Sequence, residues 1–334
     1  MTDTFTSLGA AAARVVDGLR GRDNARKTMI SEPGIYFDFP DAEYRSDPCP
    51  APSLTQSIAK VILDHSPLHA WHAHPRLNPR FEHDEERKFD IGNIAHSLLI
   101  GRGKSIAVIE ADDWRTKAAK EAREAAAVEG KLGVLRHHYD RSSAMVEAAR
   151  KQLDAAGMSD AFREGNGEVV IAWRLGHEWA RSMIDWLSPD RRTVFDLKTT
   201  AASAAPHKLG AKMADDGWAL QAAFHANGLD HLDPDNAGRR RHVFIVQEID
   251  EPFALSIAEM SESALTIGRK QAAAAVGVWA RCMASGRWPG YPAAPVVPEY
   301  PSWAESRWLD REVNEFADTP PIGGPEPVNI LMAG

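Results

Sequence analysis

The sequence has few cysteines and no long apolar run, and each absence excludes a class of protein. Only two of its 334 residues are cysteine, Cys49 and Cys282, and they lie far apart and outside any CxxC pair. Counting alone therefore rules out a disulfide framework and an all-cysteine zinc or iron–sulfur site. No stretch approaches the roughly 20 apolar residues that cross a bilayer, and no apolar run precedes a cleavage site near the N-terminus. We expect a cytoplasmic protein that does not associate with membranes.

An excess of positive charge is also missing. The chain has 47 acidic and 39 basic residues, which gives a net charge of −8. A nucleic-acid partner would therefore have to meet a local basic surface, because the field of the whole molecule does not attract a polyanion. Apolar residues make up 44% and charged residues 26%, so the composition is that of an ordinary globular protein and argues against global disorder.

The first half of the chain predicts mainly helices. Residues 1–33 indicate a weak helix and a linker, and residues 34–53, with four prolines, indicate an extended loop. Apolar spacing over 54–75 predicts two short helices, the first capped by Ser53 and the second beginning at Ser66-Pro67. Three longer helices are predicted over 86–101, 111–130 and 139–156.

The second half of the chain mixes strands and helices. Three short β-rich runs separated by turn residues predict a meander; they cover 167–175, 178–187 and 192–200. A helix over 203–229, broken near Gly217, then precedes two more strands, at 239–249 and 252–258, and a helix over 260–285. The tail from 287 carries nine prolines and is expected to be irregular, docked by Trp288, Tyr291, Trp303 and Trp308.

This order of elements predicts an α/β (α+β) protein in which helices flank a mixed β-sheet. No internal repeat and no clear linker divides the chain. We expect an N-terminal helical or irregular extension over 1–50, a principal domain over 51–292 and a proline-rich C-terminal tail over 293–334.

The segment richest in chemistry runs from Met183 to Thr200 and reads MIDWLSPDRRTVFDLKTT. Asp185 lies at the end of one predicted strand, while Asp196 and Lys198 lie two residues apart on the next and so share a face. The short turn between these strands would bring Asp185 beside Asp196. A divalent cation such as Mg²⁺ would satisfy both carboxylates, and the lysine would act on a water molecule or a phosphate. The alternative is an exposed ion pair on a sheet edge, because charges two residues apart are common.

Six segments, in order, resemble the PD-(D/E)XK nuclease superfamily and, within it, the RecE-like (exodeoxyribonuclease VIII-type) exonucleases of phages and prophages. They are IGNIAHSLL (91–99), GEVVIAW (167–173), MIDWLSPD (183–190), VFDLKTT (194–200), LQAAFH (220–225) and GRWPGY (286–291). The resemblance implies a restriction-endonuclease-like core. The four-cysteine cluster of many CRISPR-associated relatives is absent, which favours the RecE-like branch.

The resemblance also implies a metal site. His96 matches a metal-binding histidine on an early helix, and Asp185 and Asp196 match the two metal-binding carboxylates. Leu197 would offer its backbone carbonyl to the same ion. The expected ion is Mg²⁺, with Mn²⁺ as the alternative.

Three further residues match positions with other roles in the family. Lys198 matches the catalytic lysine, and Glu168 matches an acid that supports the site. Gln221 matches a helix glutamine that helps to hold the lysine and the substrate phosphate. The family often has tyrosine four residues after this glutamine, whereas this chain has His225, so a specific role for His225 is in doubt.

The activity implied by the resemblance is metal-dependent 5′→3′ digestion of linear double-stranded DNA, which leaves 3′ single strands for recombination. A RecT-like single-strand annealing protein and a ring-like homo-oligomer, a tetramer, are the implied partners. The alternatives are a single-strand exonuclease like the RecB-like relatives, an endonuclease, and a non-catalytic DNA-binding or assembly module with the same fold.

Other polar clusters carry weaker signals. The histidines His65, His69, His72 and His74 suggest zinc, but Pro67 interrupts their helical spacing and no cysteine or carboxylate completes a site. The basic side chains that would contact phosphates are Lys208, Lys212, Arg239, Arg240 and Arg241. The three arginines could equally well be solvent-exposed residues at the start of a strand.

Overall fold

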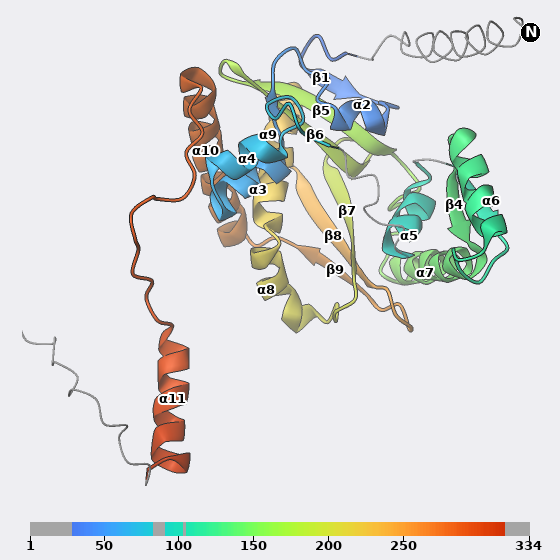
Figure 1. Cartoon of the computed structure of the whole chain (residues 1–334). Helices are drawn as coiled ribbons and strands as arrows, with labels where there is room; N and C mark the ends of the chain where they lie inside the picture. The colour runs from blue at the N-terminus through green and yellow to red at the C-terminus, as the bar shows by residue number, and fades with distance from the viewer. Residues whose placement is uncertain (1–28, 83–90, 103–104, 318–334) are drawn as a thin grey trace, which may run out of the picture. The chain divides into compact units, whose positions relative to one another are not determined.

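The computed structural model of the chain describes residues 29–82, 91–102 and 105–317 (Figure 1). The helix predicted near the N-terminus falls largely outside the described residues. The chain divides into two compact units after Gly290, and the domain boundaries expected at 50 and 292 stay predictions. The first unit holds the sheet and the candidate site, and the second holds helix α11 (Ser302–Glu315).

A seven-stranded mixed sheet forms the centre of the first unit. Its order is β1-β5-β6-β7-β8-β9, with β2 beside β6. The strands are β1 (Gly34–Tyr36), β2 (Ser53–Leu54), β5 (Asn166–Leu175), β6 (Glu178–Leu187), β7 (Thr193–Thr200), β8 (Arg241–Glu248) and β9 (Leu255–Glu259). Strands β5, β6 and β7 are antiparallel neighbours, which confirms the predicted meander. The pairs β7–β8 and β2–β6 are parallel.

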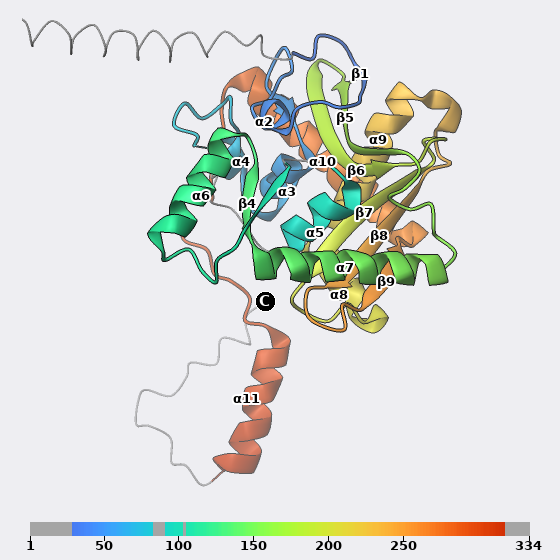
Figure 2. The same cartoon turned by 90° about the vertical axis from the view of Figure 1, so that its right-hand side faces the viewer.

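Helices cover both faces of this sheet, which confirms the predicted fold class (Figures 1 and 2). One face carries α3 (Gln56–Asp64), α4 (Pro67–Ala73), α8 (Pro206–Asp215), α9 (Trp218–Leu232) and α10 (Glu262–Ser285). The other carries α5 (Ile91–Ile100) and α7 (Arg136–Ala155). The first core packs around Trp173, Phe224 and Trp279. The second contains Met145, Trp186 and Phe195. Because both faces are covered, the middle of β8 is an unbroken buried apolar run from Val243 to Val246.

Strand β6 has one edge that is only partly paired, and this edge positions the candidate site. Strand β5 pairs along the whole length of β6. On the opposite edge, β2 pairs with Trp179 and Ala180, whereas β7 pairs only with Trp186 and Leu187. Strands β2 and β7 therefore leave residues 181–185 of β6 without a ladder partner on that edge.

A second, two-stranded parallel sheet lies at the side of the fold. It consists of β3 (Ile106–Ile109) and β4 (Leu132–Leu135), joined through α6 (Lys117–Val128). The sequence predicted α6 but neither strand. Each strand is a four-residue apolar run, too short for periodicity to separate it from a loop.

Two further expectations about local structure are wrong. Residues 34–53 are not a plain loop, because they contain β1 and the short helix α2 (Asp41–Arg45), which begins directly after Pro40. Ser53 does not cap α3; it lies in β2, and Thr55 accepts the capping hydrogen bond from the Ile58 N–H. The two short helices are confirmed, and the Ser66 hydroxyl caps α4 as expected.

The C-terminal tail is also more regular than its prolines predicted. Helix α11 begins immediately after Pro301 and runs through 14 proline-free residues. Proline is tolerated before a helix, so its frequency hid a helix-forming segment. Trp288 packs against the core of the first unit, whereas Trp303 and Trp308 are exposed. Among the described residues, no helix is both long and apolar enough to cross a bilayer.

Candidate active site

The site begins where β6 and β7 separate. Their last ladder pair is Trp186 with Phe195, and Asp185 and Asp196 occupy the next position on each strand. The ladder stops there, and the Asp185 side chain accepts a hydrogen bond of 3.0 Å from the Leu197 N–H. A carboxylate thus satisfies a backbone donor that the opposite strand leaves unpaired. Two acidic side chains are therefore held at the fork between the strands.

Helix α5 brings His96 to this fork. Its buried residues Ile94, Ala95 and Leu99 anchor it beneath the sheet, next to α7. His96 Nε2 lies 3.2 Å from Asp185 Oδ2, and the two side chains are 27% and 23% exposed. Burial disfavours the charged imidazole, but the adjacent Asp185 carboxylate outweighs it and raises the pKa of His96 above its usual value. A solvent-accessible imidazole and a carboxylate therefore face each other directly.

Asp196, Lys198 and Gln221 form a closed polar triangle on the α9 side of the sheet. The Lys198 ammonium lies 2.6 Å from Asp196 Oδ1 and donates to Gln221 Oε1 at 3.0 Å. The Gln221 amide in turn donates to Asp196 Oδ2. Asp196 is fully buried, whereas the Lys198 side chain is 26% exposed. The triangle therefore fixes the ammonium at the boundary between core and solvent.

The two carboxylates differ in acidity although they lie at opposite positions of one fork. Burial raises the pKa of Asp196 to about 6, against the attraction of Lys198, and the nearby Asp185 carboxylate adds to the rise. Burial also opposes ionisation of Asp185, but His96 and Lys198 outweigh it and lower its pKa to about 2. Burial likewise disfavours the charged Lys198, yet Asp196 and Asp185 raise the pKa of its ammonium. Such divergent carboxylates mark functional-site candidates.

Glu168 lies next to this group on β5. It occupies the position opposite Asp185, between the registered pairs Gly167 with Trp186 and Val169 with Ile184. Its φ of 50° is in the left-handed region, which is unusual for a non-glycine residue within a strand. Burial, with a contribution from the carboxylates of Asp41 and Asp185, raises the pKa of Glu168.

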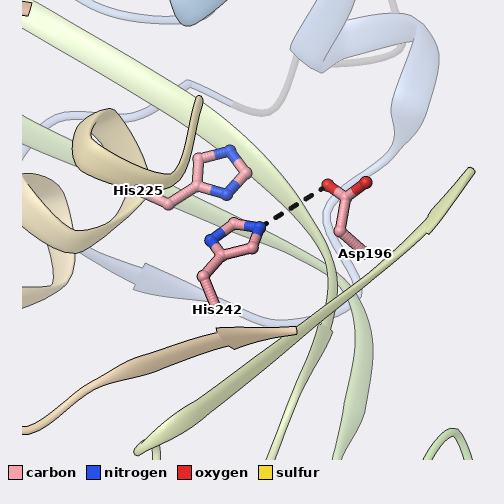
Figure 3. Close-up of side chains that lie close together, drawn as sticks. All are labelled: Asp196, His225 and His242. Atoms are coloured by element: carbon pink, nitrogen blue, oxygen red, sulfur yellow. Dashed lines mark ion pairs between the residues drawn. The ribbon is translucent and has the colours of Figure 1, made fainter. Parts of the chain in front are cut away.

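Two further histidines, His225 and His242, lie beside Asp196 (Figure 3). The sequence had assigned no role to either. His225 lies four residues after Gln221 on α9, and His242 lies on β8 two residues before Phe244. Burial lowers the pKa of His225 to about 4 and that of His242 well below its usual value. A signal for His242 was present, because it shares the two-residue spacing of the buried Phe244 and Val246.

The other predicted clusters lie elsewhere. His74 is buried and paired with Asp47, at 3.4 Å, which is incompatible with its joining His65 and His69 in a zinc site. Two of the predicted phosphate-binding arginines are in ion pairs, Arg240 with Asp230 and Asp233, and Arg241 with Glu259. Lys212 pairs with Asp216. Lys208 and Arg239 are exposed.

The donor set at the fork fits a divalent metal ion. It offers carboxylate oxygens from Asp185 and Asp196 and an imidazole nitrogen from His96; Asp196 is buried, whereas His96 and Asp185 are partly exposed. Hard cations such as Mg²⁺ and Mn²⁺ take carboxylate oxygens and tolerate an imidazole. Asp185 would serve without a protonation cost because its pKa is low. The predicted role of the Leu197 carbonyl stays a prediction.

Two strands of a mixed sheet separate at this site; one carries an Asp and the other an Asp-x-Lys sequence. A glutamine on a helix bridges the lysine and the second Asp. This arrangement defines a PD-(D/E)XK-type protein. Residues 62–294 match the model of the family described as "PDDEXK-like domain of unknown function (DUF3799)", and the chain belongs to this family. This confirms the predicted superfamily, whereas the RecE-like branch stays a prediction. No curated protein matches the chain.

One similar solved structure is a crystal structure of a protein from Eubacterium rectale described as a candidate exonuclease. The alignment covers 80% of this chain and 96% of that one, with 11% identity and a TM-score of 0.51. At this identity the likeness supports the fold.

Proposed function

We propose that the protein is a metal-dependent deoxyribonuclease that hydrolyses phosphodiester bonds. The observation that carries the proposal is the convergence of His96, Asp185, Asp196 and Lys198 at one partly exposed fork between two strands. Membership of a PDDEXK-like family supports it. A structural ion pair would need only one carboxylate beside the lysine, whereas this fork holds two, with Glu168 opposite Asp185.

His96, Asp185 and Asp196 would hold a Mg²⁺ or Mn²⁺ ion. When bound, such an ion supplies Lewis-acid polarisation of a phosphate and an acidified water. Asp185 enters this arrangement ionised, since its pKa is about 2. Lys198, with its raised pKa, carries a full positive charge, and the Gln221 carbonyl holds that charge in place. The ammonium is thus positioned to stabilise negative charge that develops on a phosphate, or to orient the attacking water.

The substrate and direction of cleavage extend this proposal. By resemblance to the RecE-like enzymes, the substrate is a linear double-stranded DNA end, digested 5′→3′ to leave 3′ single strands for recombination. The nuclease domain would comprise residues 51–292, between an N-terminal extension and the tail over 293–334. The RecT-like partner, the tetramer and the cytoplasmic location stay predictions.

The test is a cleavage assay on linear duplex DNA labelled at either the 5′ or the 3′ end. It includes Mg²⁺ or EDTA, a circular duplex and the variant Asp196→Ala. We expect early release of the 5′ label from linear DNA only, and no release with EDTA or with the variant. Cutting of the circle would indicate an endonuclease instead. A preference for single-stranded DNA would indicate the RecB-like activity, and absence of cleavage by the folded protein in either metal would contradict the proposal.

A further inference from the structure

A second group of potential metal ligands adjoins the fork and includes Asp196. It consists of Asp196, His225 and His242, contributed by β7, α9 and β8 (Figure 3). One ligand atom from each residue lies within 4.8 Å of the other two, and among the described residues this is the one such trio of histidine, cysteine or acidic side chains. The elements that carry them are central to the fold, so the trio is held by the core rather than by a surface loop.

Both imidazoles bury a nitrogen that has no hydrogen-bond partner among the described residues: Nδ1 of His225 and Nε2 of His242. Leaving a buried polar atom unsatisfied destabilises the fold, so each case calls for a cause. The two rings stack at 5.4 Å between centroids with an interplanar angle of 24°, and the His242 ring also stacks on Phe244. The packing therefore fixes the rings side by side with these nitrogens unused.

The Asp196 carboxylate can accept a further bond on the side that faces His225 and His242. His242 Nε2 lies 4.0 Å from Asp196 Oδ2, which is too long for a hydrogen bond. That oxygen accepts from the Gln221 amide, but a carboxylate oxygen has two lone-pair sites. The Lys198 ammonium forms an ion pair with the other oxygen, Oδ1, which accepts no hydrogen bond within the described residues. One acceptor position of Oδ2 is thus left for an ion on the histidine side.

We propose that Asp196, His225 and His242 are the ligands of a transition-metal ion of the zinc class, at a second site that shares Asp196 with the one at the fork. Two imidazoles and one carboxylate suit Zn²⁺ and similar borderline ions, whereas Mg²⁺ prefers oxygen ligands. Ligand atoms around a tetrahedral Zn²⁺ lie about 3.4 Å apart, given bonds of about 2.1 Å. The ligand atoms of the trio lie within 4.8 Å of one another, so each pair has to approach by less than about 1.5 Å to reach that spacing.

The two sites share Asp196 but differ in their other ligands. His96 and Asp185 complete the site at the fork, whereas His225 and His242 complete the second trio. The variant Asp185→Asn therefore impairs the proposed nuclease site and leaves the zinc trio intact. The inference about zinc stands independently of the proposed nuclease activity, and its measurement does not use DNA cleavage.

The experiment is equilibrium dialysis of the full chain against Zn²⁺ in the presence of excess Mg²⁺, with bound zinc measured by mass spectrometry. The variants are His225→Phe and His242→Phe, which keep a flat buried ring, and Asp185→Asn. His207→Ala, at an exposed position on α8, is the matched control. Circular dichroism and thermal unfolding show that each variant is folded.

We expect one tight site in the wild type, in Asp185→Asn and in His207→Ala. The two phenylalanine variants should lose that site, or bind about 100-fold more weakly, since loss of even an outer-shell partner weakens metal binding 10- to 100-fold. Zinc should also raise the unfolding temperature of the wild type but not of those variants. Equal zinc affinity and stoichiometry in the wild type and in folded His225→Phe would overturn the proposal, and so would displacement of the zinc by Mg²⁺.

Discussion

Two charged clusters lie four residues apart on the partly paired edge of β6, and their environments differ. At Arg181, the guanidinium lies 2.9 Å from Asp47, whose oxygens also accept from the Ser53 N–H and hydroxyl. His74 completes this group, and Asp47, Arg181 and His74 are all buried. At Asp185, by contrast, His96 and Lys198 remain about one quarter exposed, and a second carboxylate stands opposite.

The difference separates a structural cluster from one suited to chemistry. Around Asp47 each charge has an opposite partner inside the protein, so the cluster joins β2 to β6. Around Asp185 two carboxylates converge, and their pKa values move in opposite directions. Both clusters bury charge, but only the second keeps solvent access and an excess of acidic groups that a cation would neutralise.

The largest expected effect is on catalysis. Lys198→Met should reduce DNA cleavage about 1,000-fold or more. A positioned donor contributes about 100- to 1,000-fold by itself, and the loss of Lys198 also leaves the buried Asp196 carboxylate without its cation. Lys60→Met, which removes a lysine from an ion pair on α3, is the matched control and should cleave normally. The cleavage rates of both variants are measured under Mg²⁺. Equal rates for Lys198→Met and Lys60→Met would contradict a catalytic role for Lys198.

The next effect concerns stability. Asp47→Asn should lower the free energy of unfolding by about 3–5 kcal/mol, because it leaves the buried Arg181 without a counter-ion. Asp154→Asn, which breaks an exposed pair with Arg163, should change stability little. Urea denaturation of both variants measures this difference. A fully stable Asp47→Asn would show that the cluster around Arg181 is not structural.

A pH effect should distinguish the two clusters further. Asp196 ionises near pH 6 in the folded protein and near 3.9 in an unfolded chain. Between these values the folded state binds more protons, so the stability of the metal-free protein should fall as pH rises from about 4 to about 6. Asp196→Asn should lose this fall. Chemical denaturation across that range tests it, and an unchanged profile in the variant would assign the titration to another group.

The smallest expected effect is the change in stability on removing Asp185. Its ionised form is favoured by His96 and Lys198, which lower its pKa to about 2, so Asp185→Asn should lower the unfolding free energy by about 2 kcal/mol. Urea denaturation without metal measures this. A loss as large as that expected for Asp47→Asn would mean that the fork, too, is mainly structural.

The sequence predicted much of this molecule because its signals were local. The meander, the break at Gly217 and the cap at Ser66 each depend on a few neighbouring residues, and all are present. The position of Asp185 opposite Asp196 followed from one short turn. Strands β3 and β4 and helix α11 were missed because short apolar runs and prolines are ambiguous without tertiary context.

The contacts that distinguish the two clusters could not be predicted, because they join distant segments. Arg181 meets Asp47 across 134 positions, and His242 meets His225 through the packing of β8 against α9. The family pattern indicated His96, Lys198 and Gln221, yet the closed triangle with Asp196 appears only in the folded chain. Burial, which contributes to every pKa shift in the site, is also a property of the fold.

The most direct test of the central claim is the cleavage of linear duplex DNA by Asp185→Asn under Mg²⁺, with the unfolding free energy measured on the same sample. The account predicts that cleavage is lost while the variant stays folded, with a loss of stability of no more than about 2 kcal/mol. Cleavage at the wild-type rate by the folded variant would contradict the assignment of the fork between β6 and β7 as the nuclease site.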